Sequence, residues 1–342
     1  MAHQTDQDPS FSPAEIEEKV AQFQRSIASL TEEVGRVIVG QSEVVEGVIL
    51  ALLAGGHVLL EGVPGLGKTL LVRTLAQALD LEFARVQFTP DLMPSDITGT
   101  RTAMQDARGQ TVLDFQQGPL FTNVVLADEV NRATPRTQSA MLEAMAERSV
   151  TISGTTHDLP DPFFVLATQN PLEMDGTYPL PEAQLDRFLF KLHVSSPSPE
   201  ELHMILDRTT GREQPTVERT LSREALLSLR SLARDVPTPR HVQEVVVRLI
   251  EATHPDRSAA PEETRRYVRF GASPRGAQAV LGSAKVRAIT RGRFSVSTED
   301  VRAVLKPALR HRLIRGFEGE AEGVSPDRIL DAILDHITDG EG

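Results

Sequence analysis

Hydrophobic residues follow a helical period at the start of the chain and form short continuous runs farther on. Ser12-Pro13-Ala14-Glu15 has the pattern of a capped helix start, and apolar residues then recur every three or four positions over residues 16–30. Four apolar runs predict strands, at residues 57–61, 83–88, 124–127 and 163–167. Between them, patterns over residues 42–54, 68–79 and 135–148 predict helices. This alternation, which continues to about residue 194, predicts a three-layer α/β domain with a parallel sheet.

The second half of the chain has a different pattern. Residues 195–199 read Ser-Ser-Pro-Ser-Pro, which is typical of a linker, and strand signals fade beyond it. Helices are expected over residues 200–208, 222–234, 239–252, 274–291, 298–312 and 326–337. We therefore divide the chain into a disordered N-terminus (1–12), an α/β core with an N-terminal helix and inserted hairpins (13–196) and a smaller all-helical domain (197–342).

Composition excludes several kinds of function. The 342 residues include 36 Lys and Arg against 48 Asp and Glu, a formal net charge of −12, which makes a general nucleic-acid coat protein a poor candidate. There is no cysteine, which excludes disulfide scaffolds, thiol catalysis and Cys-ligated metals. No segment approaches the ~20 apolar residues of a membrane span, and the polar start lacks the apolar region of a signal peptide. We expect a cytoplasmic protein with no membrane insertion.

A phosphate-binding motif lies between the first expected strand and the helix after it. Residues 62–69 read G-V-P-G-L-G-K-T and match G-x-x-x-x-G-K-[ST]. In this motif the glycines let backbone N–H groups point at the β-phosphate, Lys68 bridges the β- and γ-phosphates, and the Thr69 hydroxyl ligates Mg²⁺. We expect ATP and Mg²⁺ as cofactors. The expected contact residues are Gly62, Val63, Pro64, Gly65, Leu66, Gly67, Lys68, Thr69 and Leu70.

Two acids follow the expected strand over residues 124–127. Ligands bind α/β sheets at the carboxyl ends of the strands, so Asp128 and Glu129 would lie beside the P-loop. Asp128 would hold Mg²⁺ through water, and Glu129 would orient and polarise the attacking water. An acid in the second role favours hydrolysis over nucleotide storage.

Asn170 closes the strand over residues 163–167 with a polar side chain. It could sense the γ-phosphate and position the water together with Glu129. Its place before Pro171 is equally typical of a turn-forming Asn, and this segment alone leaves both interpretations open.

Hydrolysis develops charge on the γ-phosphoryl oxygens, and arginine is the usual stabiliser of that charge. Arg132, Arg187 and Arg275 are candidates, since each follows a motif or a helix start. By residue type alone, a surface arginine is the more common case for each of them.

Taken together, these motifs resemble the AAA+ ATPases of the MoxR family. The matching stretches are residues 39–41, 62–69, 88–99, 128–133, 167–171, 176–188 and 271–275. The resemblance implies an AAA+ P-loop three-layer αβα domain followed by an all-helical lid. It also implies that Arg187 is an arginine finger for the neighbouring subunit, Arg275 the sensor-2 residue of the lid and Asn170 sensor 1, and that Val39 and Gly40 lie where adenine is held.

The long connection over residues 89–119 contains strand alternation at residues 110–115, which predicts a hairpin, and a second hairpin is expected over residues 149–160. By the resemblance, such hairpins face the pore of a ring, expected to be a homo-hexamer, and grip a protein client, often a von Willebrand factor A-domain protein. Two alternatives stay open at this point: a DNA-directed motor, which the net charge disfavours, and a nucleotide-dependent scaffold with little turnover.

Overall fold

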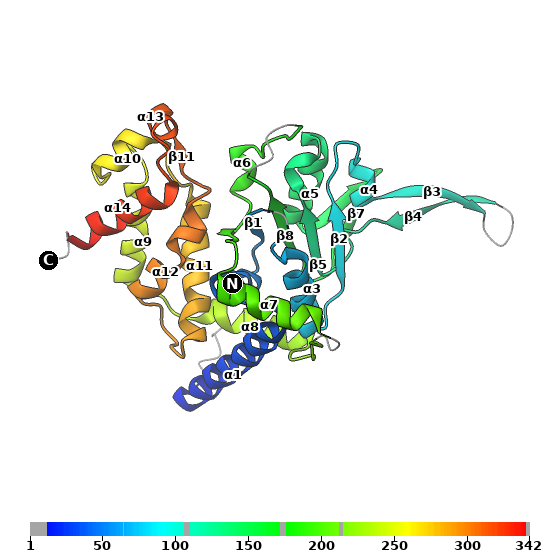
Figure 1. Ribbon diagram of the computed structural model, residues 1–342, viewed down its shortest axis with the longest axis horizontal. Coiled ribbons are helices and arrows are strands. Elements are labelled where there is room, and N and C mark those ends of the chain that lie inside the picture. Colours follow the sequence, from blue (N-terminus) through cyan, green and yellow to red (C-terminus); the bar gives the residue numbers. More distant parts are fainter. Residues whose placement is uncertain (1–11, 64, 106–109, 172–175, 212–214, 340–342) are drawn as a thin grey trace, which may run out of the picture.

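A five-stranded sheet forms the centre of the first part of the chain in the computed structural model (Figure 1), which describes residues 12–63, 65–105, 110–171, 176–211 and 215–339. Its strands lie in the order β2-β5-β8-β1-β9, and every neighbouring pair is parallel. They are β1 (Val58–Glu61), β2 (Phe83–Gln87), β5 (Val124–Asp128), β8 (Phe164–Gln169) and β9 (Phe190–His193). The expected strands are confirmed to within about two residues at each end.

Alternate residues of the central strands face two separate apolar layers. Val58 and Leu60 of β1 belong to the cluster packed by α1 (Pro13–Val37), α2 (Ser42–Ala54) and α3 (Lys68–Ala78). Leu59 lies between them and belongs to the cluster on the other face, with α5 (Pro135–Glu147). Because strand side chains point alternately to opposite faces, a run that is apolar at every position is buried on both sides. The three-layer αβα fold is therefore confirmed.

Helix α1 begins at the predicted capping box. The Ser12 side chain accepts from the Glu15 backbone, and the Glu15 carboxylate accepts from the Ser12 N–H at 2.7 Å. The apolar stripe over residues 16–30 packs inward, and α1 contacts both α3 of the core and α11 (Pro274–Thr290) of the second part. The helix thus bridges the two parts of the molecule. Of the N-terminus predicted to be disordered (1–12), residues 1–11 lie outside the described residues, and Ser12 is the N-cap of α1.

The second part is helical, as expected; its helices from residue 240 onward lie beside one edge of the sheet, whereas those within residues 199–235 lie below the sheet in this view (Figure 1). None of the described helices is both long enough and apolar enough to cross a bilayer. One short ribbon that the sequence did not predict, β10 (Val268–Phe270) with β11 (Ile314–Arg315), joins segments more than forty residues apart. Besides α11, the helices are α7 (Pro199–Thr210), α8 (Arg223–Asp235), α9 (Arg240–Ala252), α10 (Glu262–Tyr267), α12 (Thr298–Leu309), α13 (Phe317–Ala321) and α14 (Pro326–Asp339).

Both expected hairpins are present in the first part. The strands β3 (Gly99–Gln105) and β4 (Thr111–Gln117) form a long arm that projects from the core, and β6 (Ser149–Ile152) pairs with β7 (Thr155–Asp158) (Figure 1). The Phe115 ring stacks on His157 at 4.2 Å between centroids, and Arg101 donates to the Thr155 hydroxyl at 2.7 Å. The two hairpins therefore contact each other through side chains. The remaining short helices are α4 (Pro94–Thr98), η1 (Val130–Arg132) and α6 (Glu182–Leu185).

Candidate functional site

The P-loop connects the end of β1 to the start of α3. Gly65 and Gly67 have φ values of 85° and 77°, which residues with a side chain rarely adopt. An added Cβ at either glycine would meet nothing within 4 Å. Glycine is needed here for the backbone conformation and not for close packing. Gly67 is also the N-cap of α3, so its neighbours direct free backbone N–H groups toward the loop. Pro64 lies outside the described residues.

The side chain of Lys68 folds back over the loop. Its ammonium group donates to the carbonyl of Gly62. Burial lowers the pKa of Lys68, while the charges of Asp128, Glu129 and Glu61 act in the opposite direction. The charges of these three carboxylates thus partly offset the effect of burial on the pKa of this half-buried ammonium group.

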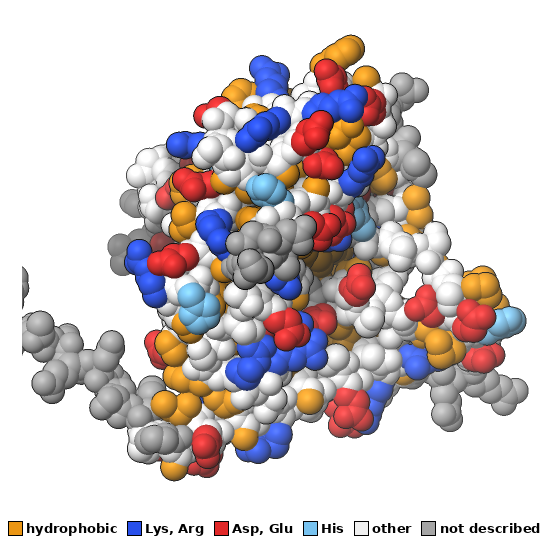
Figure 2. Space-filling model, turned by 90° about the vertical axis from the view of Figure 1, so that its left-hand side faces the viewer, with side chains coloured by type: hydrophobic (Ala, Val, Ile, Leu, Met, Phe, Trp, Pro, Cys, Tyr) orange, Lys and Arg blue, Asp and Glu red, His pale blue; other side chains and the backbone are white. Residues whose placement is uncertain are grey.

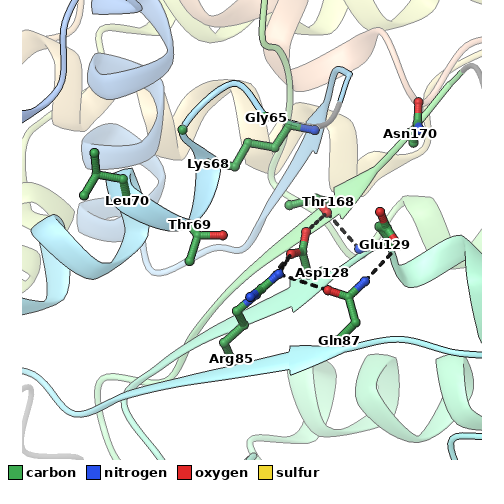
Figure 3. A pocket seen from close by; sticks show the side chains of 11 residues that line it. Gly65, Lys68, Thr69, Leu70, Arg85, Gln87, Asp128, Glu129, Thr168 and Asn170 are labelled. Carbon is green, nitrogen blue, oxygen red and sulfur yellow. Dashed lines mark hydrogen bonds and ion pairs between the residues drawn. The ribbon is translucent and has the colours of Figure 1, made fainter. Parts of the chain in front are cut away.

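A cavity of about 370 Å³ opens between the P-loop and the carboxyl ends of β5 and β8 (Figure 3). Lys68 and Thr69 line one side, and Asp128, Glu129 and Asn170 line the other. These segments are 60 to 100 residues apart in the chain, but β8 lies between β1 and β5 and brings their ends to one edge of the sheet. Most of the phosphate-site residues expected from the sequence thus share one cavity.

Asp128 is held by two neighbours. The Thr168 hydroxyl donates to its Oδ1 at 2.6 Å, and Arg85 reaches its Oδ2 at 2.7 Å from Nη2 and 3.2 Å from Nε. Arg85 comes from β2, the edge strand beside β5 (Figure 3). Its side chain is 48% exposed, so this ion pair borders solvent. A guanidinium therefore contacts one oxygen of the acid that is expected to hold the metal.

Glu129 sits in the left-handed region with φ 56°, unusual for a residue with a side chain. Its backbone N–H donates to the Thr168 hydroxyl at 2.8 Å, which anchors the turn. Its Oε2 accepts from Gln87 at 2.8 Å and pairs with Arg132 at 3.2 Å. Gln87 in turn accepts from Arg85 at 3.0 Å, so both acids belong to one hydrogen-bonded network along the rim of the cavity.

A second cavity of about 220 Å³ adjoins the first and shares Gly65, Gly67 and Leu70 with it. Val39 and Leu66 line it, and Gln41 donates to the carbonyl of Leu66 at 2.9 Å. This apolar space lies where the sequence resemblance expects adenine. The helix α7 closes its far side with Leu202 and Ile205. Gly40 is not among its lining residues and lies against the Glu201 side chain.

Arg187 and Arg275 line neither cavity. Arg187 follows α6 and donates to the carbonyl of Leu142 on α5 at 2.8 Å. Arg275 is in the first turn of α11, where its backbone N–H donates to the Ser273 cap at 3.2 Å. The structure of one chain thus separates both arginines from the cluster around Lys68.

Sequence reasoning missed Arg85 and Gln87. Both lie on β2 at alternate positions, and the strand register sets Gln87 opposite Asp128. A signal existed, because polar residues two apart on an otherwise apolar strand share one face. The sequence did not show that β2 lies beside β5, which brings these side chains to the acids. Thr168 was missed as well, although it contacts both acids.

The donor set suits a magnesium nucleotide. The ammonium of Lys68 and the backbone N–H groups at the start of α3 are complementary to phosphate oxygens. A hydroxyl from Thr69 and a carboxylate from Asp128 are the hard oxygen ligands that Mg²⁺ prefers. These residues therefore fit Mg²⁺ and ATP.

Comparison with known proteins agrees with this geometry. Residues 57–190 match the ATPase family associated with various cellular activities (AAA), and residues 261–333 match the AAA lid domain. The chain is 45% identical to Chaperone MoxR1 of Mycobacterium tuberculosis over 305 residues, covering 89% of this chain and 80% of that protein. It is 41% identical to the uncharacterized protein YeaC of Bacillus subtilis, covering 91% and 94%. The crystal structure of a provisionally assigned ATPase from Cytophaga hutchinsonii superposes with a TM-score of 0.87 at 41% identity, covering 94% and 96%.

Proposed function

The chain belongs to the MoxR family of AAA+ ATPases, and we propose that it hydrolyses Mg²⁺-bound ATP in the cavity between the P-loop and β5 to remodel or mature a protein partner. One observation supports this proposal above the others: Lys68 and Thr69 face Asp128, Glu129 and Asn170 across a single cavity. We propose residues 13–196 as the nucleotide-binding core and residues 197–342 as its lid.

In this proposal the phosphates lie against the P-loop from Gly62 to Leu70, with adenine near Val39 and Gly40. Lys68 would exchange the carbonyl of Gly62 for phosphate oxygens, and Thr69 and Asp128 would hold Mg²⁺. Bound Mg²⁺ would neutralise charge on the phosphate oxygens. Because Arg85 pairs with Asp128, this ion pair would have to open for Asp128 to hold the metal through the same oxygen.

Glu129 is proposed as the general base for the attacking water, and Asn170 as the group that positions this water beside the γ-phosphate. Oε2 of Glu129 accepts from Gln87 and pairs with Arg132. Both donors compete with an attacking water for this oxygen. We infer that binding of ATP releases Glu129 from at least one of them.

Arg187 is proposed to act on the ATP of a neighbouring subunit, with Arg275 acting as sensor 2 of its own lid. Support comes from their positions outside both cavities of their own chain. An active site completed by a second chain requires a ring, and a homo-hexamer is our proposal for it. The projecting β3–β4 hairpin would then be available to contact a client.

The proposed client is a protein, with a von Willebrand factor A-domain protein as the first candidate and the cytoplasm as the location. The name of the Mycobacterium tuberculosis relative describes it as a chaperone. On the face viewed from the lid side, Lys and Arg side chains are interspersed with Asp and Glu (Figure 2). Such a mixed surface, with a net charge of −12, favours a protein over a nucleic acid as partner.

Mixing two inactive variants tests the function and its shared site together. Arg187→Ala and Glu129→Gln should each bind ATP and hydrolyse almost none of it. Together they re-create interfaces at which an intact Glu129 meets an intact Arg187, so phosphate release should return and increase with protein concentration. An arginine finger contributes about 10³–10⁵ in rate, so a small fraction of repaired sites is measurable.

Formation of mixed rings is checked first by pulldown of one tagged variant with the other. Confirmed mixed rings without activity would contradict the shared site and direct attention to Arg132, which already contacts Glu129. Wild-type protein that binds ATP but releases no phosphate at steady state would instead support the scaffold alternative.

A further inference from the structure

A buried arginine of the lid is hydrogen-bonded to the segment that carries Arg187. Arg312, three residues beyond the end of α12, donates to the finger loop, which we define as residues 186–189. Its Nε contacts Oδ1 of Asp186 at 2.7 Å, and its Nη2 contacts the carbonyls of Asp186 at 3.1 Å and Phe188 at 2.8 Å. Its Nη1 reaches the carbonyl of Leu189 at 3.1 Å. A single side chain thus contacts three of the four residues of the finger loop.

Two more lid side chains hold the same loop. His311 lies 2.9 Å from the carbonyl of Phe188, which accepts from its Nε2. The Ser273 hydroxyl donates to Oδ2 of Asp186 at 2.9 Å. Ser273 caps α11 and precedes Arg275 by two residues. Asp186 is the residue immediately before Arg187. Its carboxylate therefore accepts hydrogen bonds from two lid segments, from Arg312 after α12 and from Ser273 at the start of α11.

Burial makes this attachment hard to open. The Arg312 side chain is 3% exposed, and burial lowers its pKa while the hydrogen bond and charge of Asp186 oppose that shift. Taking one partner from a buried, paired charge is strongly destabilising, because the other charge is left uncompensated. The Arg187 side chain donates to the carbonyl of Leu142 on the core. The finger loop also contacts the core, where the Leu189 N–H donates to the carbonyl of His57 at 2.8 Å and Phe188 is buried. We therefore expect the lid to set the position of Asp186, beside Arg187, while the Arg187 side chain can change partner.

We propose that Asp186 and Arg312 are positioning residues that tie the finger loop to the lid of its own chain, so that the lid sets where Arg187 stands at the neighbouring subunit's ATP. The proposal rests on the shared site of the proposed function. If Arg275 shifts the lid when the same chain binds ATP, Ser273 would transmit this shift of the lid to Asp186. Two sites coupled in this way influence each other reciprocally.

The mixed-ring experiment can locate this effect. The finger-supplying chain carries Glu129→Gln, and the receiving chain carries Arg187→Ala. Asp186→Asn is added first to the supplying chain alone and then to the receiving chain alone. Asparagine keeps the shape and one acceptor but removes the charge that faces Arg312. Because a displacement of about 1 Å can lower a rate about 10²-fold, we expect a 10- to 100-fold loss of mixed activity from the supplying chain and a much smaller loss from the receiving chain.

A merely structural role would not produce this asymmetry, since weakening the lid would damage the receiving chain's own ATP site at least as much. Arg312→Lys is the second variant: it keeps a charge beside Asp186 but cannot reach the carbonyls of Phe188 and Leu189 together. The matched control is Arg310→Lys, whose arginine pairs with Asp327 and touches none of the finger loop.

Nucleotide affinity, melting temperature and mixed-ring pulldown are measured for every chain. Activity in the unmodified mixture, with equal effects of Asp186→Asn in the two chains or none in either, would overturn the positioning role and leave the proposed function intact. Silence of the unmodified mixture in confirmed mixed rings would instead overturn the shared site, and the positioning role with it. Loss that follows the supplying chain for Asp186→Asn or Arg312→Lys, but not for Arg310→Lys, supports the proposal.

Discussion

The ion pairs around the phosphate cavity differ from those inside the lid in their exposure to solvent. At the cavity, Arg85 pairs with Asp128 and Arg132 with Glu129, and the two arginine side chains are 48% and 44% exposed. In the lid, Asp300 is fully buried between two arginines, each with an oxygen–nitrogen distance below 3 Å. Ion pairs of similar geometry therefore lie in two different dielectric environments, one bordering solvent and one buried.

This difference separates pairs that can exchange partners from pairs that maintain shape. Exposed ion pairs contribute about 0–1 kcal/mol, so a nucleotide and its metal can open them readily. Removal of one partner from a buried pair costs about 3–5 kcal/mol, so such pairs persist through a reaction cycle. We infer that the cavity rearranges on binding while the lid moves as a unit.

The largest expected effect is a loss of ATP hydrolysis at the cavity with almost no loss of folding stability. Glu129→Gln should lower the rate of phosphate release by about 10²–10⁴, the usual contribution of a general base. ATP should still bind and stay bound. The free energy of unfolding in urea should change by no more than about 0.5 kcal/mol, because the side chain is only one partner in a solvent-bordered network. Wild-type turnover in this variant would mean that another group activates the water.

A matched pair of substitutions measures the contrast in stability directly. Asp300→Asn leaves Arg287 and Arg293 without their shared counter-charge and should lower the free energy of unfolding by about 3–5 kcal/mol. Asp128→Asn, the same chemical change at the cavity, should lower it by about 1 kcal/mol or less. Urea titrations of both variants beside the wild type provide the comparison. Equal losses would mean that exposure does not set the strength of these pairs.

Low pH should lower the folding stability through His311, which contacts the finger loop from the lid. Burial lowers its pKa well below the ordinary 6.5, and Arg312, Lys191 and Arg310 reinforce the shift, while the hydrogen bond to Phe188 opposes it. The unfolded chain therefore binds this proton first as the pH falls below about 6.5. Stability is complete above that pH and declines below it, by up to about 1.4 kcal/mol per pH unit for each such group.

His311→Gln keeps a donor toward the finger loop and removes this titration. Its unfolding free energy should fall less than that of the wild type between pH 7 and pH 5, as measured by urea denaturation. Part of the decline should remain, because burial also lowers the pKa of His57 in the core, to about 4. Identical pH slopes for wild type and variant would show that His311 is not protonated selectively on unfolding.

The smallest expected effect concerns Arg85. Arg85→Met removes the cation that competes for Asp128, so fluorescent ATP should bind at a Mg²⁺ concentration about two- to fivefold lower, the equivalent of an exposed ion pair. A Mg²⁺ titration of nucleotide binding measures this without turnover. Arg101→Met, an exposed arginine on the β3–β4 hairpin, is the control. A higher Mg²⁺ requirement would mean that Arg85 helps to hold the nucleotide.

Local elements of this protein could be predicted because their signals are local. The capping box at Ser12 starts α1, and alternating glycines allow the turn before α3. The continuous apolar strands required burial on both faces, which led to the three-layer fold. The residues of the phosphate cavity followed from their places at strand ends, whereas their catalytic roles remain predictions.

The partners of these residues depended on the tertiary structure. Arg85 and Gln87 reach the two acids only because β2 lies beside β5, and chain order does not specify which strand borders which. Arg312 and Asp186 are 126 residues apart and meet where the lid packs against the core. By itself the sequence determined the longer helices, most of the central strands and the phosphate motif, since each depends on neighbouring residues. The tertiary structure decided which charges are paired and how deeply they are buried, because both depend on the packing of distant segments.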